Sequence, residues 1–295
     1  MNRRRRILLG AVLATMLAGA GVAVWRWSVR EPTYQGRSLS EWLEDYGSVP
    51  PATNTGVDVA VRAMGTNAIP TLLRMLQARD SRLENRLVWL ARHQSLIPIR
   101  SHDPFARKFQ AVSAFAALGP QARTALPELV RLSRDRDHAQ FANDALAGVG
   151  PEAIPMLLVN LTNQPRFVQS YAVGAVGQLG TNGAVFVPPL LACLKNPEWI
   201  VRAEAVDSLG FIGQEPGLVV PALVASLHDS VPWVCLHAIR ALGRFGPQAA
   251  NAAPAIQEVI AAPETRNDEF QQAAAEALRK IVPGGSKAEL VPARE

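Results

Sequence analysis

Cysteine and aromatic residues are scarce in this sequence. The 295 residues include two cysteines, Cys193 and Cys235, which lie in apolar helical patterns. Two such cysteines make neither a disulfide framework nor a CxxC metal pair, and we interpret them as small buried hydrophobic residues. Aromatic residues make up 6% of the chain, a content that favours closely stacked helices over an aromatic-rich β-sandwich.

Acidic residues are absent from positions 1–30, which hold six of the 30 basic residues. The remainder has 24 basic against 25 acidic residues, so the net charge of +5 belongs to the N-terminus. Nucleic-acid binding needs a clustered positive field. The one candidate is an arginine cluster interrupted by Asp80 and Glu84, which is typical of a solvated helix face. Its members are Arg74, Arg79, Arg82, Arg86, Arg92 and Arg100. We expect no nucleic-acid partner.

Residues 1–27 have the pattern of a membrane segment. Four arginines, from Arg3 to Arg6, precede an uncharged run of nineteen residues, Ile7–Trp25. As a helix this run would be about 28 Å long, close to the ~30 Å hydrocarbon core of a bilayer. It predicts a single-pass anchor with the following domain on the extracytoplasmic side. The alternative is a signal peptide, cleaved after small residues such as Ala18-Gly19-Ala20, which would leave a secreted or periplasmic protein.

Residues 28–57 read as a linker with a short helix. Ser38 and Glu41 have the spacing of a capping box, which opens a helix by satisfying its first backbone N–H groups. We expect Trp42 and Leu43 to dock this helix against the domain that follows.

Six glycines recur in one local context. One and four residues before each stand large apolar residues, and five before stands a small one. This spacing predicts an amphipathic helix that a neighbouring helix approaches closely, with the glycine as a left-handed C-cap. The glycines are Gly65, Gly119, Gly150, Gly180, Gly213 and Gly246. The small residues are Ala60, Ala114, Ala145, Ala175, Ser208 and Ala241.

A proline follows each of these glycines by five or eight residues. Proline is favoured in a first helical turn, so each marks a second helix. The prolines are Pro70, Pro127, Pro155, Pro188, Pro221 and Pro254, each followed two residues later by Leu or Ile. Helical hairpins at a period of 30 to 33 residues stack into an all-α solenoid.

The segment Val201–Gly213, continued by Val220-Pro221-Ala222-Leu223, resembles a short HEAT repeat. It is similar to the HEAT-like repeats of phycobilisome lyases. The pattern covers residues 58–283 as six repeats and a terminal helix. An insertion at 79–108 departs from it, and we expect residues 284–295 to be a flexible tail.

The resemblance implies two possible enzyme classes, because some enzymes contain HEAT-like repeats. Deoxyhypusine hydroxylase, which also has HEAT-like repeats, binds two irons through His-Glu pairs. None of the five histidines here is followed by Glu; they are His93, His102, His138, His228 and His237. Bilin lyases share only the packing pattern. Hydrolase, phosphate-loop and His-Glu-x-x-His motifs are absent from the sequence.

We therefore predict a non-catalytic protein-binding scaffold or adaptor that needs no cofactor and no metal. The alternative is a lyase- or hydroxylase-related protein that acts on another protein. By resemblance to short HEAT arrays, the proline-led helices would line the concave side. Their outward residues would then form a groove of mixed charge for a protein or peptide: Arg74, Arg131, Asn160, Lys195 and Glu258.

Overall fold

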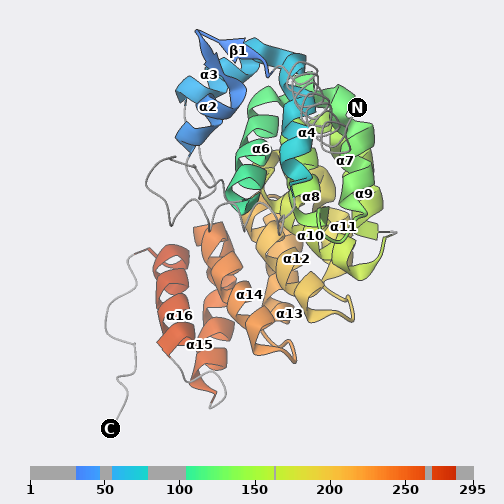
Figure 1. The fold of residues 1–295 in the computed structure, drawn as a ribbon. Helices are drawn as coiled ribbons and strands as arrows, with labels where there is room; N and C mark the ends of the chain where they lie inside the picture. The colour runs from blue at the N-terminus through green and yellow to red at the C-terminus, as the bar shows by residue number, and fades with distance from the viewer. Residues whose placement is uncertain (1–30, 47–54, 79–103, 163, 263–267, 284–295) are drawn as a thin grey trace, which may run out of the picture.

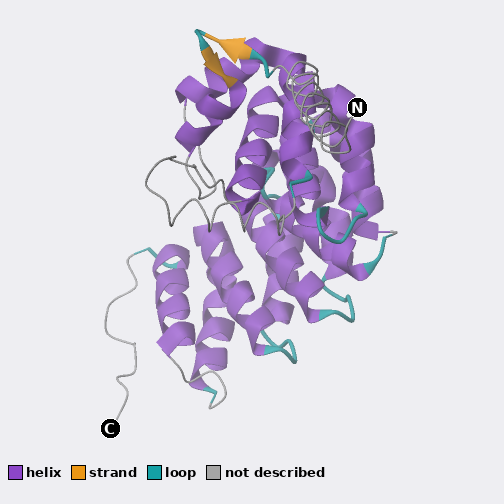
Figure 2. Ribbon diagram, viewed as in Figure 1, coloured by secondary structure: helices purple, strands orange, loops and turns teal. Residues whose placement is uncertain are grey.

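The computed structural model describes residues 31–46, 55–78, 104–162, 164–262 and 268–283. The predicted membrane segment (1–27), most of the predicted insertion (79–103) and the predicted tail (284–295) lie outside these residues. Within the described residues no helix has both the length and the apolar character to span a bilayer. Those residues are mostly helical and include one short β-hairpin (Figure 2).

The hairpin was not predicted from the sequence. Strand β1 (Thr33–Tyr34) pairs antiparallel with β2 (Arg37–Ser38). The backbone φ is +50° at Gln35 and +80° at Gly36, the left-handed pair that a tight hairpin turn requires. The helix α2 (Leu39–Leu43) follows at once.

The capping box predicted at the start of α2 is confirmed. The Ser38 side chain accepts a hydrogen bond from the Glu41 N–H, and the Glu41 carboxylate accepts one from the Ser38 N–H at 2.8 Å. Leu43 is fully buried, and Trp42 Nε1 donates to the Tyr34 carbonyl at 3.0 Å. The hairpin and α2 thereby pack on the first helix of the array.

Six helix pairs and one further helix make up the rest of the described chain. The pairs are α3 (Thr55–Met64) with α4 (Ile69–Leu76), α6 (Pro104–Leu118) with α7 (Leu126–Ser133), α8 (Ala139–Val149) with α9 (Ile154–Thr162), α10 (Arg166–Gly177) with α11 (Val187–Cys193), α12 (Trp199–Ile212) with α13 (Pro216–Ser226), and α14 (Pro232–Phe245) with α15 (Ala253–Ala261); α16 (Asp268–Ile281) follows. Short 3₁₀ turns join the two helices of every pair except α12 and α13.

The helix ends predicted at the glycines and the helix starts predicted at the prolines are confirmed at most positions. All six repeated glycines have positive φ, and Gly213 lies in the left-handed helical region with φ 61° and ψ 23°. Five of the six prolines are the second residue of their helix. Pro221 is the exception, because α13 already begins at Pro216, which is equally suited to a first turn, and Pro221 lies inside the helix.

The boundary predicted for the insertion is wrong at its C-terminal end. Residues 104–108 belong to α6. Three phenylalanines from α6 and α8 pack edge to face there, with ring centroids 4.6 to 5.4 Å apart. These are Phe105, Phe109 and Phe141. The aromatic contacts hold the additional first turns of α6 on the neighbouring helix.

The helix pairs form two curved layers. Helices α6, α8, α10, α12, α14 and α16 follow one another along the inside of an arc, and α7, α9, α11, α13 and α15 lie along its outside (Figure 1). The predicted apolar positions of both layers meet between them. Their largest fully buried members are Phe115, Leu72, Leu129, Leu146, Leu157 and Leu190.

The curvature has a local cause in the inner layer. A Cβ added to Gly210 of α12 would lie 2.8 Å from the Ala241 Cβ of α14, and one added to Gly177 would lie 2.6 Å from the Ser208 hydroxyl. Such contacts bring the inner helices close together, whereas the outer helices contact one another much less. The array therefore curves with the glycine-capped helices on its concave side. The expectation that the proline-led helices line that side is wrong.

Candidate functional site

The inner face of the arc displays one set of sequence positions. Side chains two, six, nine and thirteen residues before each repeated glycine lie on one side of their helix, because this spacing matches the helical period. We call this set the inner register. In α10 and the residue after it, it comprises Phe167, Tyr171, Gly174 and Gln178; in α12, Ile200, Glu204, Asp207 and Phe211; in α14, Trp233, His237, Arg240 and Arg244.

Large apolar side chains are exposed on this register. Phe211 is 56% exposed, Trp233 51%, Ile200 46% and Tyr171 37%. They come from three neighbouring helices of the inner layer, α10, α12 and α14, on the concave side (Figure 1). Aromatic residues are enriched in the cores of protein interfaces, so their exposure marks this face as a candidate contact surface.

An ion-pair network joins α12 and α14. Arg244 Nη1 donates to Asp207 Oδ1 at 2.9 Å, and His237 Nδ1 is hydrogen-bonded to Asp207 Oδ2. The Arg244 guanidinium also stacks 3.9 Å from the ring centre of Phe211. Burial opposes ionisation of Asp207, but the hydrogen bonds from His237 and Arg244 outweigh it and lower the pKa of this carboxyl. Asp207 is therefore a charged, fully engaged group.

Two other carboxylates on the same face have a different environment. Burial raises the pKa of Asp144 to about 7, although Gln178 Nε2 donates to its Oδ1 at 2.9 Å. Burial also raises the pKa of Glu204, and the charge of Asp207 raises it further. The charge of Glu204 in turn contributes to the raised pKa of Asp144. Ionisation of this pair is thus disfavoured in the folded protein.

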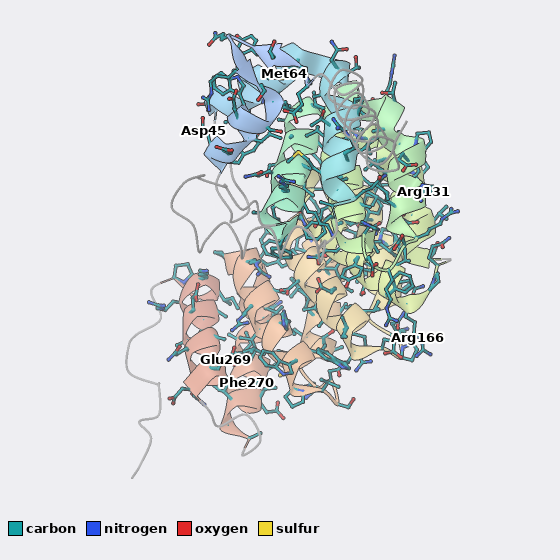
Figure 3. All side chains as sticks on the ribbon, viewed as in Figure 1. Asp45, Met64, Arg131, Arg166, Glu269 and Phe270 are labelled. Carbon is teal, nitrogen blue, oxygen red and sulfur yellow. The ribbon has the colours of Figure 1, made fainter. Side chains whose placement is uncertain are left out.

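The residues predicted from the sequence do not form a groove. Arg74, Arg131, Lys195 and Glu258 are exposed on or beside helices outside the inner layer. Arg74 donates to Thr71 Oγ1 in its own helix. Arg131, which lies on the outer side of the arc (Figure 3), forms a 2.6 Å ion pair with its helix neighbour Glu128.

Asn160 is not an outward residue as predicted, because it is 1% exposed. Its Nδ2 donates to Ser133 Oγ and to Asn143 Oδ1, both at 2.9 Å. Ser133 and Asn143 are themselves fully buried, on α7 and α8. Asn160 therefore completes a buried polar network that joins three helices.

The two cysteines are free and buried, as predicted. Burial raises the pKa of both thiols to about 11. His237 is half-buried against Asp207. Among the described residues, no three His, Cys, Asp or Glu side chains gather as metal ligands. The inner register could have been found from the sequence by counting back from each glycine to the positions opposite the buried stripe.

The stacked helix pairs, arranged in two layers, define an α-solenoid. Comparison with known proteins identifies the type of repeat. Residues 154–235, from α9 into α14, match the family model for HEAT repeats. The predicted resemblance to HEAT-repeat proteins is thereby confirmed. No curated protein matches the chain in a sequence comparison.

Solved structures with a similar fold include natural and designed repeat proteins. The karyopherin Kap121p is 12% identical, with a TM-score of 0.50 over 82% of this chain and 29% of the karyopherin. A designed armadillo repeat protein is 21% identical, with a TM-score of 0.42 over 72% of this chain and all of that one. The complex of CpcE and CpcF of phycocyanin lyase from Nostoc sp. PCC7120 is 20% identical, with a TM-score of 0.38 over 86% of this chain and 99% of that one.

Proposed function

We propose that this protein is a non-catalytic scaffold that binds a protein partner on its inner face. The observation that carries the proposal is the exposure of Tyr171, Ile200, Phe211 and Trp233 on one register of three neighbouring inner helices. On the surface of a monomeric soluble protein, exposed apolar side chains of this size are usually scattered singly. Here they share the concave side of a curved array, where several repeats can contact one ligand at once.

The proposal agrees with the chemistry of the face. It combines aromatic side chains with arginines, the residue types that most often dominate binding energy at protein interfaces. The karyopherin of similar fold is bound to the extreme C-terminus of a protein phosphatase. This property belongs to that protein, but it is compatible with a solenoid that holds a polypeptide segment.

Under the same proposal, residues 1–27 anchor the array on the extracytoplasmic side of a membrane. The support is the sequence of this segment, four arginines followed by nineteen uncharged residues. We expect a C-terminal alkaline phosphatase fusion to be active and a reporter that works only in the cytoplasm to be inactive. Activity of the cytoplasmic reporter would contradict the topology. A mature chain that starts after Ala20 would replace the anchor by a signal peptide.

Site-specific photocrosslinking in native membranes tests the scaffold function. A photoreactive residue replaces Phe211 or Ile200 on the inner face. Matched controls replace Leu218 of α13, which is 60% exposed, and Val159 of α9, which is 41% exposed. We expect one discrete adduct from the inner positions and none from the outer ones. Adducts of equal yield from both sides, or from the outer side alone, would contradict the proposal.

A further inference from the structure

Position Gly174 interrupts the row of side chains on the inner face. The equivalent positions of the neighbouring inner helices carry Asp144 and Asp207. A Glu204 carboxylate oxygen lies 2.8 Å from the point where a Cβ on Gly174 would be. Asp144 of α8, bonded to Gln178 at the end of α10, and Glu204 of α12 thus lie near α10 from its two sides, and the charge of Glu204 acts on Asp144.

The cations of the inner face are already paired. Arg244 bonds Asp207 at 2.9 Å, and Arg240 bonds Glu269 of α16 at 2.9 Å. Both arginines belong to α14, so these pairs neutralise the C-terminal part of the face. A partner's acidic side chain would have to displace an existing ion pair there.

The carboxylates around Gly174 have no such partner. In the part of the chain that the structure describes, neither Asp144 nor Glu204 forms an ion pair, and Asp144 is bonded only by the neutral amide of Gln178. Burial raises the pKa of both groups; the charge of Glu204 adds to the rise at Asp144, and the charge of Asp207 adds to the rise at Glu204. A cation placed between them would favour the ionised form of both carboxyl groups, so the charge pattern of the face is complementary to a basic ligand.

We propose that the partner presents a basic extended segment to the inner face, with a lysine or arginine side chain beside Gly174 between Asp144 and Glu204. This inference rests on the proposed scaffold function and adds the chemistry of the partner. Tyr171 lies one helical turn before Gly174, and Ile200 one turn before Glu204. These exposed side chains supply apolar contacts for the residues that flank the cation, and the Tyr171 ring offers a face to the cation itself.

Selection of peptides by the purified full chain tests this chemistry. The chain in detergent micelles is used to select binders from a display library of random linear peptides. We expect the selected peptides to be enriched in lysine or arginine relative to the starting library. A library that yields no binders, or binders without basic side chains, would overturn the proposal.

Variants locate the binding of these peptides. The double variant Asp144→Asn with Glu204→Gln should weaken binding of a synthetic selected peptide at least tenfold, because neither side chain can then ionise beside the cation of the ligand. Glu258→Gln removes one carboxylate from the exposed outer helix α15 and should leave affinity within twofold. Equal affinity for the double variant and for the unchanged chain would overturn the proposal.

Two further measurements separate the alternatives. If the double variant fails to fold, Gln178→Arg serves instead, since it leaves both carboxylates in place and supplies an internal cation; the same loss of affinity is expected. Mg²⁺ and Ca²⁺ are tested alone. A rise in melting temperature that depends on Asp144 and Glu204, without peptide binding, would assign the carboxylates to an ion and overturn the peptide proposal.

Failure of this inference is distinguishable from failure of the scaffold function. A crosslinked partner at Phe211 whose binding is indifferent to Asp144 and Glu204 would keep the scaffold and reject the basic segment. Absence of inner-face crosslinks together with absence of peptide binders would reject both.

Discussion

Arg244 of α14 donates to Asp207 of α12, and the same relationship recurs two repeats earlier, where Gln178, the residue after α10, donates to Asp144 of α8. Both hydrogen bonds are 2.9 Å long. In each pair the donor lies two residues before its glycine and the acceptor six residues before the preceding one. The geometry is repeated but the charge is not, because arginine neutralises its carboxylate and glutamine does not. This difference gives the two halves of the inner face their distinct electrostatic character.

Replacement of the neutral donor Gln178 by arginine should give Asp144 the electrostatic environment that Asp207 has. Gln178→Arg places a cation where Arg244 stands in the later repeat, so we expect the pKa of Asp144 to fall towards its ordinary value. Titration of the Asp144 carboxyl carbon by NMR in the two proteins measures the change. Gln272→Arg on α16, an exposed glutamine outside the inner register, is the control and should leave the titration unaltered.

The raised pKa of Asp144 predicts a pH-dependent stability. Its folded-state pKa is about 7, against 3.8 for an ordinary aspartate. Between these values the folded protein keeps a proton that the unfolded chain has released. The contribution of Asp144 is therefore fully present below about pH 4 and is lost as the pH rises through 7, at roughly 1.4 kcal/mol per unit of pKa difference.

Asp144→Asn should flatten this decline, because asparagine does not titrate. Denaturant unfolding between pH 5 and pH 8 measures the free energy of unfolding of the unchanged chain and of the Asp144→Asn variant. Asp45→Asn, which removes a surface carboxylate of the N-terminal segment, serves as the control. A decline of equal slope in all three proteins would show that Asp144 is not its cause.

Ala241→Leu should overpack the contact with Gly210. Three added carbons must fit where a Cβ on Gly210 would already lie 2.8 Å from Ala241 Cβ, so we expect a loss on the order of 1–3 kcal/mol. Ala225→Leu makes the same change at an exposed site on α13 and should cost little. Thermal melts measure both, and an unchanged melting temperature for Ala241→Leu would mean that the inner helices can separate freely.

Asn160→Ala should destabilise the fold without acting at the binding face. The substitution leaves Ser133 Oγ and Asn143 Oδ1 without their shared donor inside the core. An unsatisfied buried polar group costs about 1–3 kcal/mol. Asn182→Ala, at an exposed position of η5 (Gly180–Phe186), is the matched control. Loss of inner-face peptide binding by a still-folded Asn160→Ala protein would contradict the assignment of this residue to the core.

The sequence was sufficient to predict the repeat because its signals are local. Gly213 ends a helix through its own φ, Pro188 starts one through its missing N–H, and Leu209 is buried because its spacing follows the helical period. Each of these signals acts within a few residues of chain. The capping box of Ser38 and Glu41 is predictable for the same reason.

The concave side and its chemistry were decided only by tertiary structure. Which layer lies inside the arc depends on how closely Gly210 approaches Ala241, a contact between residues a full repeat apart. The pKa of Asp144 depends on burial and on Glu204, two repeats away. Asn160 is buried because Ser133 and Asn143 meet it from other helices, although its own helix would equally allow an outward residue. Local pattern fixes where helices begin and end, but solvation and charge at a site are sums over neighbours that only the folded chain brings together.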